Sequence, residues 1–219
     1  MTEAVTWEGS CKTHLLRSFR QLPVPDGTQN TSKSEETTTP RHNQDEQKDE
    51  NVIDLAAARE AKNSILDAAA HEEVALLMDI RIKVDFLIDK YLDTAGTGGF
   101  GKDQHSPVFE QIWEHIAKTA CEILQLRGAL PVSPEMAATE VANLLIRKQA
   151  DYGHDNISRF GRIGLMVRMH DKVARLENLR RDSAGAPNNE SIDDNLLDLI
   201  GYSTIGKMWE DRTFMIPLQ

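Results

Sequence analysis

The chain has 219 residues, 40 % of them hydrophobic and 27 % charged, which is normal for a soluble protein with one domain of ordinary size. Its net charge of −10 excludes indiscriminate binding to DNA or RNA, because phosphate backbones require a basic surface. No segment reaches the roughly 18 to 20 uncharged apolar residues of a membrane helix, and the start lacks the pattern of a secretory signal. We therefore expect a cytoplasmic protein with no membrane partner.

The residue types predict an all-α fold. Aromatic residues make up only 5 % of the chain, and Ala, Leu and charged residues dominate its second half. These residues favour helices, whereas sheets need runs of β-branched and aromatic residues. We expect a four-helix bundle-like core, preceded by a long helix and a disordered N-terminal tail.

Residues 1–50 form the predicted tail. They include QLPVPDGTQNTSKSEETTTPRHNQDEQKDE, a polar run that cannot bury enough apolar surface to offset the entropy of ordering. The apolar patch at 13–19 permits a short docking helix, but we interpret it as part of the tail.

Residues 51–106 form a second predicted region, a long helix followed by a Gly-rich connector. The stretch 51–93 contains neither Gly nor Pro, and apolar residues recur in it at spacings of three and four: Leu77, Ile80, Val84, Leu87 and Tyr91. This seam indicates a helix that packs on its own domain or, alternatively, a dimerisation helix.

Residues 107–219 contain the four helices of the predicted core. Ser106-Pro107 and Ser133-Pro134 are typical helix starts, with an N-cap hydroxyl followed by proline. The first two helices end near Gly128 and Asp151, and a third runs from about Phe160 to Arg181. The fourth begins with a capping box at Ser191 and ends near Arg212.

Three aspartates on the third and fourth helices suggest a metal site. Asp194 and Asp198 are four residues apart, so they project from one side of their helix. Asp171 lies mid-helix among Val167, Val173, Leu176 and Leu179, which we take to mark the buried side. If the two helices are antiparallel neighbours, three carboxylates meet, and such oxygens suit Mg²⁺ or Mn²⁺.

The same aspartates also have an ordinary interpretation. Asp171 can pair with Arg175 one turn later, and Asp194 can simply cap its helix. That interpretation gives Asp198 no role. It also leaves unexplained a basic cluster between 147 and 181, which contains nine Lys and Arg residues and only four acidic residues. Such a cluster can hold a small polyanion even on an acidic chain.

The motif KQADYG, residues 148–153, suggests a nucleotide pocket at a helix end. Lys148, Asp151, Tyr152 and, shortly after, Asn156 supply an ammonium, a carboxylate, a phenol and an amide. A cation suits phosphates, an aromatic ring suits stacking, and an amide suits a base or sugar edge. A plain helical turn with an Asp and a packed Tyr is the alternative.

Together KQADYG, RMHDKVARLENL and DDNLLDLIGYS resemble the nucleotide modification associated domain of phage and bacterial proteins, over about residues 136–210. That family is similar to the MazG-like all-α nucleoside triphosphate pyrophosphohydrolases. The resemblance implies a Mg²⁺-dependent, homo-oligomeric enzyme that releases pyrophosphate from a nucleoside triphosphate, in a host cytoplasm if phage-encoded. It implies metal binding by Asp171, Asp194 and Asp198, catalysis by Asp171 and Asp198, and phosphate contacts from Lys148, Lys172 and Arg175.

One departure keeps a second function open. MazG-like enzymes carry Glu-x-x-Glu and Glu-x-x-Asp motifs, whereas the core here has no Glu-x-x-Glu, and Asn195 stands three residues before Asp198. The alternatives are therefore a noncatalytic nucleotide-binding sensor or adaptor, or a purely helical assembly protein.

Overall fold

The computed structural model describes residues 5–22, 47–96, 107–181 and 190–218, and these are helices and turns without a strand. The all-α class is confirmed. Residues 1–22 and 75–219 belong to one compact unit and residues 23–74 to another. In the second unit the described part, 47–74, is the beginning of a helix that continues into the first.

The described residues form the following helices: α1 (Trp7–Phe19), α2 (Gln47–Gly96), α3 (Pro107–Leu126), α4 (Pro134–Tyr152), α5 (Asp155–Ser158), α6 (Gly161–Arg181) and α7 (Ile192–Glu210). The cap signals in the sequence predicted the starts of α4 and α7 correctly. Ser133 accepts a hydrogen bond from the amide of Met136, and Ser191 accepts one from Asp194. Such caps satisfy backbone donors that have no partner within the helix.

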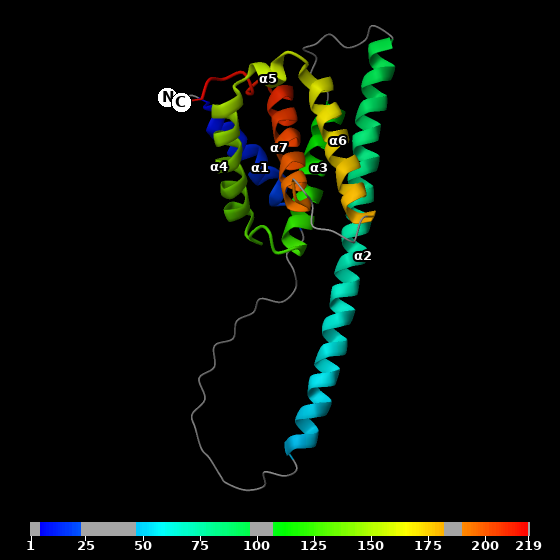
Figure 1. Ribbon diagram of the computed structural model, residues 1–219. Coiled ribbons are helices and arrows are strands. Elements are labelled where there is room, and N and C mark those ends of the chain that lie inside the picture. Colours follow the sequence, from blue (N-terminus) through cyan, green and yellow to red (C-terminus); the bar gives the residue numbers. More distant parts are fainter. Residues whose placement is uncertain (1–4, 23–46, 97–106, 182–189, 219) are drawn as a thin grey trace. The chain divides into compact units, whose positions relative to one another are not determined.

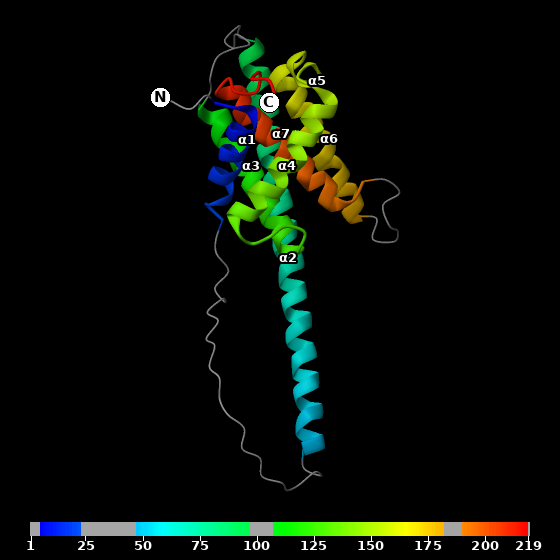
Figure 2. The same cartoon turned by 90° about the vertical axis from the view of Figure 1, so that its left-hand side faces the viewer.

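Helix α7 is the centre of the compact unit (Figures 1 and 2). It contacts α3, α6, α1 and α4. Close approach requires small residues on α7. A Cβ atom at Gly206 would lie 2.6 Å from Cδ2 of Trp113, and one at Gly201 would lie 2.8 Å from Cδ2 of Leu145. These two glycines let α3 and α4 approach the α7 backbone closely.

Helix α1 corrects the prediction of a disordered tail. Trp7, Cys11, Leu15 and Phe19 are all fully buried, and they recur every four residues along one face of the helix. The helix is anchored to the end of α7, where Lys207 donates a hydrogen bond to Ser18 Oγ over 3.2 Å. The four-residue apolar period was visible in the sequence. Residues 23–46 of the predicted tail lie outside the described residues.

The apolar seam of α2 packs within its own unit. Ile80, Val84 and Leu87 are fully buried, and Leu77 and Tyr91 pack partly buried against the same core. The interpretation of α2 as a helix packed on its own domain is therefore confirmed. The seam that suggested a homo-oligomer is buried inside one chain, so it no longer supports one. A homo-oligomer therefore stays a prediction. No helix in the described ranges is long and apolar enough to cross a membrane.

Candidate functional site

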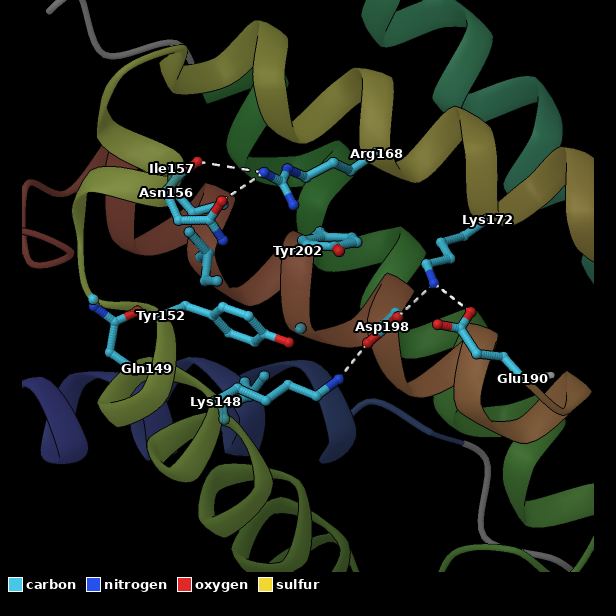
Figure 3. Close-up of a pocket in the computed structure, with 14 residues that line it drawn as sticks. Lys148, Gln149, Tyr152, Asn156, Ile157, Arg168, Lys172, Glu190, Asp198 and Tyr202 are labelled. Atoms are coloured by element: carbon cyan, nitrogen blue, oxygen red, sulfur yellow. Dashed lines mark hydrogen bonds and ion pairs between the residues drawn. The ribbon is translucent and has the colours of Figure 1, made fainter.

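A cavity of about 440 Å³ opens between α4, α5, α6 and α7. This volume falls within the range of small-molecule pockets. Its wall combines bases, one central carboxylate, two phenol rings and an amide, contributed mainly by Lys148, Tyr152, Asn156, Arg168, Lys172, Asp198 and Tyr202. Figure 3 shows that these side chains come from separate helices and converge on one space.

Three helices each contribute a pair of side chains spaced four residues apart. The pairs are Lys148 and Tyr152 on α4, Arg168 and Lys172 on α6, and Asp198 and Tyr202 on α7. Residues at this spacing lie above one another on one helix face. One face of each helix therefore lines the cavity over about one turn.

A chain of ion pairs occupies one end of the cavity (Figure 3). Asp198 accepts hydrogen bonds from Lys148 Nζ and from Lys172 Nζ, the latter over 2.8 Å. Lys172 also donates to Glu190 Oε2 over 2.6 Å. Burial works to lower the pKa of Lys172, but bonding to Asp198 and Glu190 outweighs it and leaves the pKa above its ordinary value. Lys172 is thus firmly cationic at neutral pH.

The opposite end of the cavity is amide-rich. Arg168 Nη2 donates to Asn156 Oδ1 over 2.7 Å and to the Asn156 main-chain oxygen over 3.4 Å. Gln149 is buried at the wall, and its Nε2 has no hydrogen-bond partner among the described residues. The rings of Tyr152 and Tyr202 lie between the two ends (Figure 3).

The predicted substrate-binding residues divide into two groups. Lys148, Tyr152, Asn156 and Lys172 line the cavity. Asp151 does not line it and is exposed, because it precedes Tyr152 by one residue and so faces about 100° away on α4. Arg175 also lies outside the cavity wall, where it donates to the main-chain oxygen of Glu190 over 3.4 Å.

Sequence reasoning missed the following polar or charged side chains of the cavity wall: Gln149, Arg168, Glu190 and Tyr202. The signal that would have found two of them is the four-residue spacing. Arg168 stands four before Lys172, and Tyr202 stands four after Asp198. Gln149 and Glu190 follow no such pattern.

The structure does not bring the three predicted metal ligands together. Asp198 lines the cavity, whereas Asp171 is exposed and lies outside it. Asp194 is held by the start of its own helix, where its carboxylate accepts hydrogen bonds from the Ser191 hydroxyl over 2.7 Å and the Ser191 amide over 2.9 Å. No group of three metal-ligating side chains occurs within the described ranges.

The rotation of α6 explains the exposure of Asp171. Leu165, Met166, Met169, Val173 and Leu176 are buried and mark the core face of this helix. Asp171 lies on the opposite face. Val167, which the sequence interpretation placed on the buried side, is 51 % exposed.

The carboxylates at the cavity wall do not fit a preformed Mg²⁺ site. Both Asp198 and Glu190 are already paired with lysine ammonium groups. A divalent cation would have to displace these groups and then remain beside them, which is electrostatically unfavourable. The residues present are better suited to holding an anion.

The position of Asp194 gives a stability prediction. Ser191 and Asp194 form a reciprocal capping box, and the Ser191 hydroxyl holds the pKa of Asp194 below its usual range. Ser191→Ala is expected to lower the free energy of unfolding by about 1 kcal/mol, because an N-terminal amide of α7 loses its acceptor. Urea unfolding followed by circular dichroism measures the change. An unchanged midpoint would show that the cap contributes nothing.

Comparisons of the chain with protein-family models, with curated proteins and with solved structures each found no match. The similarity to MazG-like proteins therefore stays a prediction. Function has to be argued from the cavity itself.

Proposed function

We propose that the chain binds a nucleotide in the cavity between α4, α5, α6 and α7, with the phosphates at the lysine end. The observation that carries this proposal is the meeting of three residue pairs from three helices. The pairs provide the Lys148 and Lys172 ammonium groups at one end and the Tyr152 and Tyr202 rings in the middle. Asn156 on α5 adds an amide at the other end. A nucleotide presents groups that complement these in the same order: an anionic phosphate chain, a sugar and a flat base.

The charge of the cavity supports an anionic ligand. Three cations, Lys148, Arg168 and Lys172, line it together with only two carboxylates, Asp198 and Glu190. Phosphate oxygens can replace carboxylate oxygens as acceptors for the lysine ammonium groups, since both are anionic and accept short hydrogen bonds. A nucleoside triphosphate would bring several such oxygens at once.

Calorimetric titration with a panel of deoxynucleoside triphosphates, with EDTA and then with Mg²⁺, tests the proposal. We expect binding, and a rise in stability of about 2.7 kcal/mol when free ligand exceeds Kd a hundredfold. Lys172→Met should weaken binding about tenfold, because it removes one charge-assisted hydrogen bond while Lys148 remains. Lys12→Met is the matched control, since Lys12 is exposed on α1 and does not line the cavity.

The proposal fails if no nucleotide binds at millimolar concentration in either buffer. It also fails if Lys12→Met and Lys172→Met weaken binding equally. In that case the affinity for nucleotide would depend on the net charge of the protein and not on the cavity.

Hydrolysis of the bound nucleotide is a second candidate function. It is favoured by one observation, the Asp198 carboxylate at the end of the cavity where the phosphates would lie. Cleavage between the α and β phosphates by water would yield a nucleoside monophosphate and pyrophosphate. Chromatography of the titration mixtures with Mg²⁺ or Mn²⁺ detects both products. Binding without turnover would leave the noncatalytic sensor or adaptor as the function.

A further inference from the structure

Arg168 determines which end of the Asn156 amide faces the cavity. A guanidinium group carries only donors, so the Asn156 atom that it contacts over 2.7 Å must be the carbonyl oxygen, Oδ1. The amide nitrogen, Nδ2, is then the end left for a ligand. Figure 3 shows this nitrogen on the cavity side of Asn156, with the oxygen turned toward Arg168.

The surroundings of Asn156 hold this orientation. Arg168 also contacts the main-chain oxygen of Asn156 over 3.4 Å, so one guanidinium contacts both the side chain and the backbone of α5. The neighbouring residue Ile157 is buried and anchors α5 to the core. Nδ2 itself makes no hydrogen bond to any described residue. It is a positioned donor without an acceptor in the part of the chain that the structure describes.

Gln149 provides a second, independent amide at the same wall. Its side chain is buried, and its Nε2 finds no acceptor among the described residues. A buried donor without an acceptor costs free energy. Gln149 Nε2 is closed to solvent and is turned away from the cavity (Figure 3), so Asn156 Nδ2 is the donor that calls for a ligand carbonyl oxygen.

We infer that Asn156, positioned by Arg168, makes the cavity select nucleotides whose base has a carbonyl oxygen in place of an amino group. This inference rests on the proposed nucleotide binding and specifies the class of base. An amino group would place donor against donor and leave both without a partner. A carbonyl oxygen accepts from Nδ2.

Two pairs of nucleotides, in which a carbonyl oxygen with a protonated neighbouring ring nitrogen replaces an amino group with an unprotonated one, test the inference. We expect dITP to bind at least about tenfold more tightly than dATP, and dUTP at least about tenfold more tightly than dCTP, the discrimination typical of a hydrogen bond to a base edge. Equal affinities within each pair overturn the inference but leave the proposed nucleotide binding intact. Absence of binding by all four overturns both.

Asn156→Asp tests the polarity of the contact. Arg168 would hold one carboxylate oxygen, and the other oxygen would face the cavity as an acceptor. The preference is expected to reverse, so that dATP and dCTP bind more tightly than their carbonyl counterparts. An unchanged preference shows that another group reads the base and overturns the inference.

Arg168→Met tests the positioning role. The variant has two separable effects. The loss of the positive charge by itself weakens the binding of all four nucleotides by the same factor, so it does not change the ratios of their affinities. Release of the Asn156 amide brings the dITP to dATP ratio toward one, since either end can then face the ligand. Thermal melting of each variant confirms that it is folded before titration. A ratio that stays at the original value overturns the role of Arg168.

Discussion

Arg162→Met is expected to lower the free energy of unfolding by about 3–5 kcal/mol, because the variant leaves a buried carboxylate without its guanidinium. Arg162 Nε donates to Glu210 Oε1 over 2.6 Å, and Nη2 donates to Oε2 over 2.7 Å. The Arg162 side chain is 5 % exposed and that of Glu210 is 0 % exposed. Both carboxylate oxygens would lose a charge-assisted hydrogen bond at once.

A double variant separates the unpaired charge from lost packing. Arg162→Met with Glu210→Met removes both charges and keeps apolar volume, so it is expected to recover most of the stability lost in Arg162→Met. Guanidinium chloride unfolding followed by circular dichroism measures both variants. A double variant as unstable as the single one would show that packing of Arg162, including its position 5.7 Å from the centre of the Phe109 ring, accounts for the loss.

The starts of α4 and α7 and the end of α4 were predictable because they depend on local chemistry. Ser133 and Ser191 are N-caps whose hydroxyl groups bind backbone amides within three residues. Gly153 ends α4 with a φ of 66°, a conformation that favours glycine. Such signals need no knowledge of the rest of the fold, so they can be read directly from the residues.

Helix α1 was missed because the polar segment after it dominated the interpretation of residues 1–50. The composition of that segment argues against a packed core, but composition averaged over fifty residues conceals a thirteen-residue helix. The four-residue spacing of Trp7, Cys11, Leu15 and Phe19 was the stronger evidence. These side chains are stabilised by contacts with α3, α4 and α7, which no local pattern reveals.

The candidate site could be predicted only in part, because it depends on how each helix is rotated about its axis. Adjacent residues on a helix differ by about 100°, so an error of one residue moves a side chain from the cavity to solvent. This error separates exposed Asp171 from Lys172, which lines the cavity. Lys148, Tyr152 and Asn156 were predicted because they lie at or just after the end of α4, and Asp198 because it stands four residues after Asp194.

Asp198→Asn is expected to tighten the binding of nucleoside triphosphates in EDTA by about ten- to hundredfold. Asp198 accepts hydrogen bonds from both Lys148 and Lys172, so it competes with a ligand for the two ammonium groups. Asparagine retains the shape of the side chain but not its charge. Lys148 is then released to phosphate oxygens, Lys172 keeps only Glu190 as a partner, and one repulsive charge is removed from the cavity wall.

Asp171→Asn is the matched control for this variant, because it removes the same charge from an exposed position on α6. It should change affinity by less than about twofold, since exposed charges are strongly screened. Inorganic tripolyphosphate, titrated alongside the nucleotides, should follow the same order, because the gain lies at the phosphate end of the cavity. Melting curves show whether either variant is destabilised.

The sign of the Asp198→Asn effect distinguishes the two candidate functions. If Asp198 only balances the lysines, its loss strengthens binding with or without Mg²⁺. If Asp198 instead serves a metal-dependent hydrolase, its loss weakens the Mg²⁺-dependent part of binding and abolishes the release of pyrophosphate. A weaker affinity in EDTA would contradict both, because it would mean that Asp198 itself contacts the ligand as an acceptor. Titrations in the two buffers therefore identify the role of this carboxylate with one substitution.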